Sequence, residues 1–280
     1  MSAPIALQLY TVRQELEQDF AGVVRRIAEI GYVGVEPFTP PGRALDKDAV
    51  RLFKELGLTV PAVHGPLPLG EHKNQAQDML AQLGCKRLIC SMLDPSYFTS
   101  RDQIKRGCDM LNEAGHVAVA NGFSLGYHSH WWEFEPAEGW VPFDVMLEML
   151  DPVVFIELDT YWAKTGGADP VALIGKLGSR APLLHLKDGA AVLRRVPVAS
   201  GQADVAAAEK AAFEQSYRAM IADMVALGEG AMDLPAVVKA AQASADWLIV
   251  ELDACNRDML TAVELSYRYM VGHRLARGNR

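Results

Sequence analysis

The stretch VVFIELDTYWAKTGGADPVALIGKLGSRAPLLHLK, residues 153–187, decides the predicted fold. It opens and closes with apolar runs that have the length of buried strands and end in polar residues. Between them, Asp169 and Pro170 are residue types that begin a helix, and Gly178 is the type that ends one. The stretch therefore predicts a strand, a helix and a second, parallel strand joined by a right-handed crossover.

Polar side chains lie at the ends of both predicted strands. Side chains alternate along a strand, so Glu157 and Asp159 share one face of the first strand. By the same rule, His185 and Lys187 share one face of the second. Because parallel strands end at the same edge of a sheet, carboxylate and imidazole groups would meet there. Such ligands suit a divalent metal ion, and we interpret Glu157 as a structural carboxylate one layer below it.

The rest of the chain repeats the alternation of strand and helix. The predicted strands are residues 5–10, 33–36, 59–64, 87–90, 124–130, 153–159, 183–187 and 247–251. The predicted helices are residues 20–30, 46–56, 71–83, 101–121, 143–150, 170–177 and 258–273. This alternation predicts an α/β protein with a closed (β/α)8 TIM barrel, in a single domain over residues 1–280. No GxGxxG motif follows the first strand, which argues against a dinucleotide-binding sheet.

The connection after the seventh strand breaks this rhythm. Residues 189–230 are far more than a barrel loop needs, and residues 203–227 within them predict an additional amphipathic helix. Two roles for this helical insertion stay open at this point. It would form either a lid over the barrel mouth or a contact between subunits, and the second role would produce a homodimer.

Composition and charge restrict the class of partner. The net charge of -8, from 35 acidic against 27 basic residues, argues against nucleic acid or an anionic membrane. The start of the chain, MSAPIALQLYTV, lacks the features of a signal peptide, and no apolar run is long enough to span a membrane. We therefore expect a cytoplasmic protein with no membrane or nucleic-acid partner. The cysteines lack metal-site spacing and are typical of small buried side chains in a reducing compartment; they are Cys85, Cys90, Cys108 and Cys255.

In a barrel of this kind the active site lies at the C-terminal ends of the strands. The polar residues that close the predicted strands are Gln8, Glu36, His64, His128, His130, Glu157, Asp159, His185, Lys187, Glu251 and Asp253. We predict that Gln8, Glu36 and His64 contact the substrate. Aromatic rings beside such polar groups suit stacking on a sugar face, and for this role we favour Trp162.

Several segments resemble one known family. The segments GYVGVEPF (31–38), YHSHWWEF (127–134), LGEGAMDLPAV (227–237), WLIVELD (247–253) and residues 157–188 are similar to the xylose isomerase-like TIM barrel superfamily, in particular its sugar phosphate isomerase/epimerase branch. The resemblance covers nearly the whole chain. It implies a divalent metal held by Glu, Asp, His and Glu at successive strand ends. Asp159, His185 and Glu251 match three of these positions.

The fourth position departs from the pattern. Where many members of the family have Glu in the fifth strand, this chain has His128 and His130, followed by Glu133 in the turn. We predict that Glu133 is the fourth ligand and keep His128 as the alternative. Epimerases of the family use two metal-bound carboxylates as acid and base, so here a histidine, His128 or His130, would take one of those roles.

The predicted chemistry is proton transfer at a carbon beside a carbonyl group. A divalent ion, Mn, Mg, Co or Zn, that binds the carbonyl and a neighbouring hydroxyl lowers the pKa of that carbon and stabilises the enediolate. His130 or Glu251 would move the proton, and Lys187 would neutralise the developing oxyanion. The first hypothesis is therefore a metal-dependent isomerase or epimerase of a keto or aldo sugar. The alternative is a metal-dependent dehydratase or lyase that acts on an inosose-like or 3-keto sugar.

Two further hypotheses have less support. Phosphodiester cleavage, as in relatives of endonuclease IV, requires more histidines than the 7 in this chain. The non-enzymatic hypothesis is that the protein is a sugar-binding barrel that has lost its activity. The sequence shows no Gly-rich loop with Lys after the seventh or eighth strand, and Gly228-Glu229-Gly230 is acidic. We therefore expect an unphosphorylated sugar as substrate.

Overall fold

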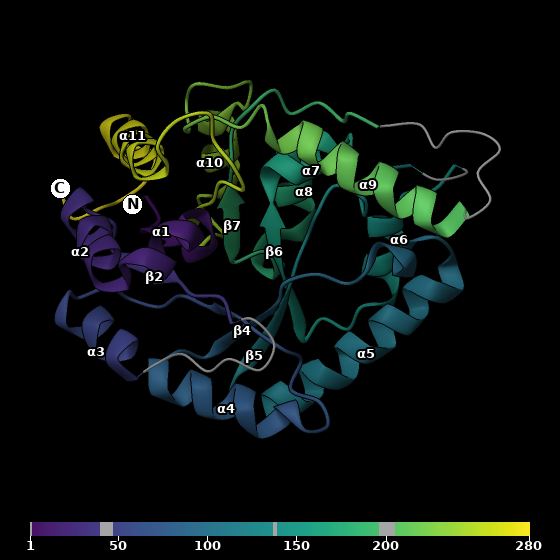
Figure 1. Cartoon of the computed structure of the whole chain (residues 1–280). Helices are drawn as coiled ribbons and strands as arrows, with labels where there is room; N and C mark the ends of the chain where they lie inside the picture. The colour runs from purple at the N-terminus through teal and green to yellow at the C-terminus, as the bar shows by residue number, and fades with distance from the viewer. Residues whose placement is uncertain (1, 40–46, 137–138, 196–204) are drawn as a thin grey trace.

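The structure is a computed structural model that describes residues 2–39, 47–136, 139–195 and 205–280 (Figure 1). Its strands form one eight-stranded sheet in which each ladder is parallel. The order along the sheet is β2-β1-β8-β7-β6-β5-β4-β3. The strands are β1 (Ile5–Gln8), β2 (Gly34–Glu36), β3 (Val63–His64), β4 (Arg87–Cys90), β5 (Ser124–His128), β6 (Val154–Asp159), β7 (Leu183–Leu186) and β8 (Trp247–Val250).

The end strands β2 and β3 meet through short bridges instead of a full ladder. The bridging pairs are Gly34–Thr59 and Phe38–His64. Pro37 and Pro61 have no backbone N–H to donate, which interrupts the pairing and shortens β3 relative to the predicted strand over 59–64. The bridges bring the sheet round on itself. The predicted TIM barrel is therefore confirmed.

Helices surround the strands (Figure 1). They are α1 (Arg13–Gln18), α2 (Phe20–Ile30), α3 (Lys47–Glu55), α4 (His72–Leu83), α5 (Arg101–Ala120), α6 (Pro142–Met149), α7 (Thr160–Thr165), α8 (Pro170–Leu177), α9 (Val205–Ile221), α10 (Leu234–Ala241) and α11 (Met259–Gly272). Helices α1, α7 and α10 are not among those predicted from the sequence; α1 and α7 have only 6 residues each, too few to show a clear helical period, whereas α10 follows shortly after the segment predicted as an insertion. None of the described helices is long and apolar enough to cross a lipid bilayer.

The helix α2 illustrates how the sequence sets these elements. The side chain of Asp19 accepts a hydrogen bond from the Gly22 N–H and begins the helix. Gly31 ends it at φ +120°, where a Cβ would lie 2.3 Å from the Tyr267 hydroxyl, so only glycine fits. The apolar face of α2, which includes Val24 and Ile27, is buried against the strands.

The interior of the barrel changes from apolar to polar along its axis. A separate cluster of buried side chains fills its N-terminal end, with Phe155 and Trp247 packed against it; the members are Ala6, Ala62, Ile89, Leu183 and Ile249. Gly126 belongs to this layer, and its missing Cβ makes room for the Phe155 ring. The apolar plug leaves the C-terminal end of the barrel to polar side chains. Cys255 is half-buried, whereas the other three cysteines are buried as predicted.

The connection from β7 to α10 contains the additional helix α9, which spans Val205–Ile221 within the predicted range of 203–227. Residues 196–204 of the predicted insertion lie outside the described residues. The buried carboxylate of Asp188, directly after β7, organises the return of the chain. It accepts hydrogen bonds from the backbone N–H groups of Gly189, Gly228, Gly230 and Met232. Gly230 must lack a side chain, because a Cβ there would lie 2.2 Å from Asp188 Oδ1.

Candidate active site

The polar groups of the site occupy the interior layer above the apolar plug. Each lies two residues beyond an interior apolar residue or glycine on its strand, as Gln8 follows Ala6 and His185 follows Leu183. The alternation of side chains therefore turns them all toward the barrel axis. The residues of this layer are buried, and they are Gln8, Glu36, His64, His128, Glu157, His185 and Glu251. Asp159 and Lys187 lie two residues beyond Glu157 and His185, respectively. Asp159 is the last residue of β6, and Lys187 follows the last residue of β7.

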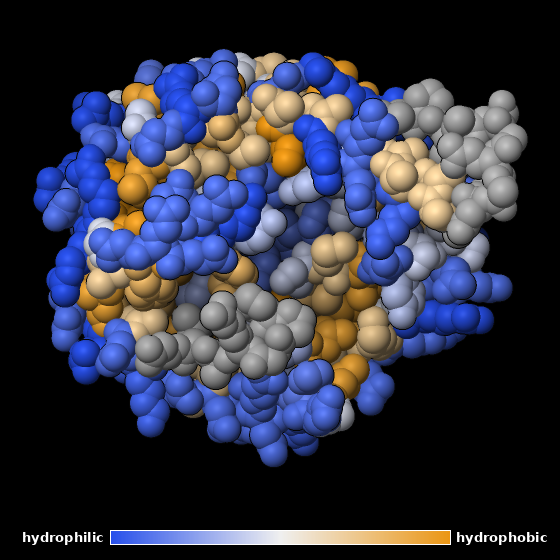
Figure 2. Space-filling view, viewed as in Figure 1, coloured by the Kyte–Doolittle hydropathy of each residue, from blue (hydrophilic) through white to orange (hydrophobic). Residues whose placement is uncertain are grey.

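A cavity of about 390 Å³ opens above this layer. Figure 2 shows a hollow near the middle of the face, with hydrophilic residues at its depth and hydrophobic ones at its margin. We call its polar residues the floor; they are Gln8, His64, His128, Lys187, Glu251 and Asp253. We call the aromatic lining residues that follow β5 or belong to α7 and α9 the wall; they are Trp131, Trp132, Trp162, Phe213 and Tyr217. The rim consists of Tyr10, Phe38, Ser91, Met92 and His130.

Two fully buried carboxylates lie beneath the cavity. Glu157 Oε2 lies 2.8 Å from His64 Nε2 and 3.0 Å from His128 Nδ1. Glu36 Oε2 lies 2.7 Å from His185 Nε2 and accepts a hydrogen bond from the Gln8 amide at 2.8 Å. Glu36, predicted to contact the substrate, is therefore placed under Gln8 and His185, whereas Gln8 and His64 line the cavity.

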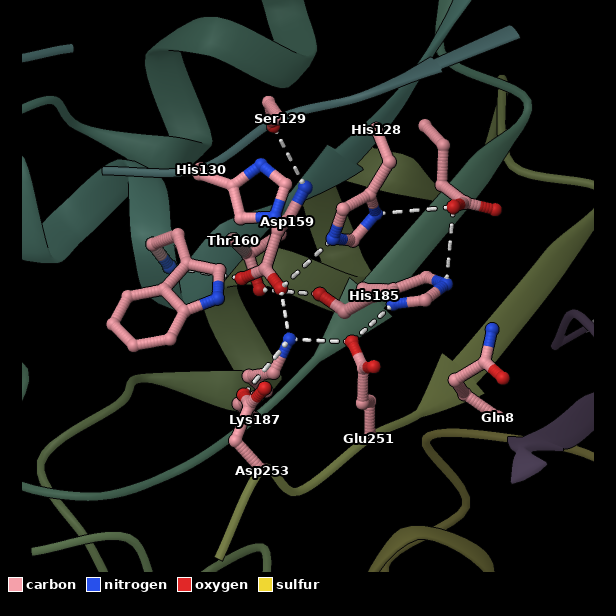
Figure 3. Close-up of polar contacts among 12 residues, drawn as sticks. Gln8, His128, Ser129, His130, Asp159, Thr160, His185, Lys187, Glu251 and Asp253 are labelled. Carbon is pink, nitrogen blue, oxygen red and sulfur yellow. Dashed lines mark hydrogen bonds and ion pairs between the residues drawn. The ribbon is translucent and has the colours of Figure 1, made fainter. Parts of the chain in front are cut away.

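The ammonium group of Lys187 joins the carboxylates of the upper layer (Figure 3). Its Nζ donates to Asp159 Oδ2 and to Glu251 Oε2, each at 2.5 Å, and lies 3.5 Å from Asp253 Oδ2. Glu251 Oε2 also lies 2.7 Å from His185 Nδ1. The other oxygen of Asp159 accepts the Trp162 N–H at 2.8 Å, which begins α7 and fixes this carboxylate at the end of β6.

Burial and charge set the protonation of these groups. Burial alone would lower the pKa of His64, but the carboxylates of Glu157 and Glu36 raise it to about 9. Burial likewise opposes the charge of Lys187, yet its carboxylate neighbours, first Asp159, raise its pKa well above the usual value. His128 differs, because burial and then the charge of His185 lower its pKa well below the usual value. At neutral pH Lys187 is cationic and His128 is a neutral imidazole.

The described residues contain two groups of four side chains whose ligand atoms lie within 4.8 Å of one another. The groups are His64, His128, Glu157 and His185, and His128, Asp159, His185 and Glu251. One oxygen each of Glu36, Glu157 and Asp253 is buried without a hydrogen-bond partner. Carboxylate oxygens and imidazole nitrogens are the donors that Mn, Co and Zn prefer, so the residues fit a divalent metal. In the second group, Lys187 contacts oxygens that the metal would also use, so its ammonium group would have to move or share them.

Glu133, the predicted fourth ligand, lies outside both groups. Its carboxylate is fully buried, accepts the Tyr127 hydroxyl at 2.5 Å and accepts the His130 N–H at 2.8 Å. Tyr127 belongs to the layer between strands and helices, so these bonds turn Glu133 away from Asp159. The structure places the alternative residue, His128, in both groups.

The wall includes residues that sequence reasoning did not single out. Trp131 stacks on Phe213 at 5.1 Å and on Tyr217 at 5.7 Å between ring centroids. The Tyr217 hydroxyl donates to Asp253 Oδ1 at 3.1 Å. Helix α9 therefore forms part of one side of the cavity through Phe213 and Tyr217, and both of its predicted roles stay predictions. The sequence contains a pattern that could have predicted this contact: Phe213 and Tyr217 are four residues apart in an Ala-rich helix, so their rings share one face.

Two other predicted residues stand at the edge of the floor. Trp162 lines the cavity, and Lys187 Nζ lies 5.6 Å from the centroid of its ring. His130 lies at the rim, stacked on Trp132 with ring centroids 4.3 Å apart. The distance between the His128 and His130 rings is 4.9 Å. The structure thus brings His130 near the floor but not into either group of metal-binding residues.

A family model described as xylose isomerase-like TIM barrel matches residues 24–268. The chain belongs to the xylose isomerase-like TIM barrel family. Inosose dehydratase of Geobacillus kaustophilus is 28% identical over 194 residues, which cover 59% of this chain and 61% of that protein. Inosose dehydratase of Clostridium beijerinckii is 24% identical over 194 residues, with 63% and 60% covered. The matched part spans less than two thirds of either relative.

Two solved structures share the fold of this chain. A sugar phosphate isomerase/epimerase from Parabacteroides distasonis has a TM-score of 0.74 at 24% identity, covering 99% of this chain and 96% of that chain. The IOLI protein with a bound zinc atom has a TM-score of 0.65 at 16% identity, covering 97% of each chain. At these identities the likeness shows the fold alone.

Proposed function

We propose that the protein is a metal-dependent isomerase or epimerase that moves a proton at the carbon beside the carbonyl group of an unphosphorylated keto or aldo sugar. The observation that carries the proposal is the contact of Lys187 and Glu251, which line one cavity, with Asp159 and His185, which lie buried beside them. An acid, a base and ligands for a cation are thus within reach of one bound molecule.

The metal would be held by His128, Asp159, His185 and Glu251. When bound, a divalent cation supplies a positive charge that polarises a carbonyl group and stabilises an enediolate. Glu133 is not part of this proposed set, because its carboxylate is bound to Tyr127 and to the backbone at His130.

Glu251 is the group best placed to accept the proton. Burial would raise its pKa, but the charges of Lys187 and His185 lower it well below the usual value, so Glu251 is ionised and lines the cavity. Lys187, 2.5 Å away, can stabilise negative charge on a substrate oxygen. A single base on one side suffices for isomerisation.

Epimerisation requires a second group on the opposite side of the substrate. His130 follows β5, whereas Glu251 follows β8, and β6 and β7 lie between these strands in the sheet. His130 therefore approaches the cavity from another side than Glu251, and its Nδ1 has no hydrogen-bond partner. His128, neutral and next to His130, is the further candidate for this acid or base role.

Dehydration is the second candidate reaction. Two relatives are named inosose dehydratases, and loss of water requires an acid that protonates the departing hydroxide. Lys187 lines the cavity and carries a proton within reach of the departing hydroxide, but its carboxylate neighbours raise its pKa well above the usual value and make it a weak acid; its main contribution would be to stabilise the negative charge of the leaving group. The alternative function is therefore a metal-dependent dehydratase or lyase of an inosose-like or 3-keto sugar.

One experiment tests both candidates. The metal-loaded protein is incubated in deuterium oxide with a panel of unphosphorylated keto sugars, aldo sugars and inososes, and products are followed by NMR and mass spectrometry. An isomerase or epimerase introduces deuterium at the carbon beside the carbonyl without loss of water. A dehydratase yields a product lighter by one water molecule. The absence of both outcomes across the panel, with metal bound, would contradict enolate chemistry altogether.

A further inference from the structure

The two halves of the cavity differ in chemistry. The floor presents carboxylate, amide, ammonium and imidazole groups, whereas the wall presents five aromatic rings. Met92 extends the apolar surface at the rim and is 48% exposed. A sugar or cyclitol ring, with hydroxyl groups around its edge, matches the floor, but it leaves most of the wall without a partner. A ligand that matches both halves therefore has a polyhydroxylated end and an apolar end.

The wall is assembled from three segments that are distant in the sequence. Trp131 and Trp132 follow β5, Trp162 belongs to α7, and Phe213 and Tyr217 belong to α9. Buried Trp131 forms the base on which the α9 rings stack. Trp132 and Phe213 are only half-buried, and their ring centroids lie 5.6 Å apart. Their open faces are the part of the wall that a ligand can reach.

A phosphate group is poorly matched to this cavity. Two cationic side chains line it among the described residues, and buried carboxylates hold both: Lys187 is bound to Asp159 and Glu251, and His64 to Glu157. Glu251 and Asp253 also line the cavity and would repel an anion. The ligand that fits the floor is therefore uncharged.

The cavity has space and polar contacts for a ligand of two parts. Its volume of about 390 Å³ lies within the range of roughly 300–1,000 Å³ that is typical of pockets for drug-sized ligands. Nε1 of Trp132 and Nδ1 of His130 are buried and have no hydrogen-bond partner. Both side chains line the cavity, but these two atoms are not exposed to it, and His130 Nδ1 lies 3.8 Å from Glu133 Oε1; the polar contacts to a sugar ring therefore come from the floor.

We propose that the substrate is an uncharged sugar or cyclitol that carries a flat apolar substituent, such as an aromatic ring. The sugar ring lies on the floor, and the substituent packs against Trp132, Phe213 and Met92. The inference rests on the proposed function for the reaction at the floor. It concerns recognition, however, so it is tested by binding and not by turnover.

The test compares phenyl β-D-glucopyranoside with methyl β-D-glucopyranoside by isothermal titration. Both lack a carbonyl group, so neither is consumed by the proposed reaction, and they differ only in the apolar substituent. We expect the phenyl compound to bind about tenfold more tightly, because an aromatic ring would stack on the wall. Equal affinities, or no detectable binding of the phenyl compound, would overturn the proposal. If glucose 6-phosphate binds more tightly than both compounds, the proposal that the ligand is uncharged is wrong.

Variants locate the effect. Phe213→Ala should bring the ratio of the two affinities toward one, whereas Phe213→Tyr, which keeps the ring, should preserve it. Val119→Ala alters an exposed residue of α5 outside the cavity lining and serves as the control. Should Phe213→Ala fail to fold, Trp132→Leu tests the same surface. An unchanged ratio in a folded Phe213→Ala or Trp132→Leu variant would contradict the assignment of the wall.

Failure of this inference can be distinguished from failure of the proposed function. If the protein prefers the phenyl compound but exchanges deuterium into no carbonyl sugar, the proposed ligand class is supported and the proposed reaction is contradicted. If the protein exchanges deuterium into simple sugars but binds the phenyl and methyl compounds equally, the proposed reaction is supported and the proposed ligand class is contradicted.

Discussion

The floor and the wall of the cavity differ in how the fold holds them. The floor residues lie at or just beyond strand ends, where the alternation of side chains and hydrogen bonds to neighbours fix their direction. The wall residues lie in the turn after β5 and in the helices α7 and α9, outside the strands. For the proposed function, the comparison implies that the reaction would depend on the barrel itself, whereas ligand choice would depend on segments added around it. Each prediction below tests this division.

The largest effect is expected from Asp159→Asn, at the buried carboxylate that contacts Lys187 of the floor. The amide cannot supply the charge of a carboxylate to a divalent cation, so we expect loss of bound metal and a fall in turnover of at least about a thousandfold. Elemental analysis and deuterium exchange measure the two effects. Asp169→Asn, at the exposed start of α8, is the matched control. If Asp159→Asn retains its metal, Asp159 is not a ligand, and the proposed assignment of the metal site to the strand ends is contradicted.

The next effect is expected from Lys187→Met. It removes the cation that lies between Asp159 and Glu251 and leaves buried carboxylates without compensation. We expect the free energy of unfolding of the metal-free protein to fall by about 3–5 kcal/mol. Urea denaturation measures it, with Lys105→Met on the exposed face of α5 as control. Added metal should restore part of the loss, because a cation again faces these carboxylates; no recovery would argue against a metal site at this position.

A third prediction concerns Asp188, whose carboxylate holds the chain that returns from α9 close to the end of β7. Asp188→Ala leaves four backbone N–H groups without their acceptor, at Gly189, Gly228, Gly230 and Met232. We expect a loss of stability of about 2–3 kcal/mol and weaker ligand binding, because the segment that follows α9 loses its anchor. Thermal unfolding and titration measure these effects. Asp94→Ala, an exposed cap, provides the comparison. A variant as stable as the control would show that the Asp188 carboxylate is not needed.

The smallest effect is expected at the wall, from Tyr217→Phe. The change removes only the hydroxyl that donates to Asp253 and keeps the ring stacked on Trp131. We expect a loss of about 1 kcal/mol in stability and a preserved preference for the phenyl ligand. Chemical denaturation and titration measure these. If this variant abolished deuterium exchange, the division between floor and wall would be wrong, because a wall residue would then take part in the reaction.

Much of the floor and of the buried groups beside it could be predicted because strand periodicity is a strong local signal. Alternation along two predicted parallel strands places Asp159 beside His185, and the register of β6 and β7 pairs these residues. Glu251 and Gln8 follow from the same rule on β8 and β1. The barrel itself follows from the repetition of strands and helices.

The remainder depended on contacts that no local pattern contains. Glu133 lies in a turn, where alternation no longer applies, and its bond to Tyr127 decides its direction. The direction of α9 depends on Trp131, which lies more than seventy residues earlier in the sequence. The depth of Glu36 depends on its bond to His185 across the barrel. Tertiary contacts decided each of these positions.

The bridges between β2 and β3 have a consequence for motion. Four backbone hydrogen bonds among the described residues join the two sides, and they involve residues 33, 35, 37, 39, 59 and 64. The sheet is therefore closed at this position by isolated bridges with a proline on either side, and not by a continuous ladder, which favours local opening here. Amide protons of Val35 and Thr59 should exchange with solvent before those of β5 to β8. Local opening would then carry His64 outward while Asp159, His185 and Glu251 keep their places.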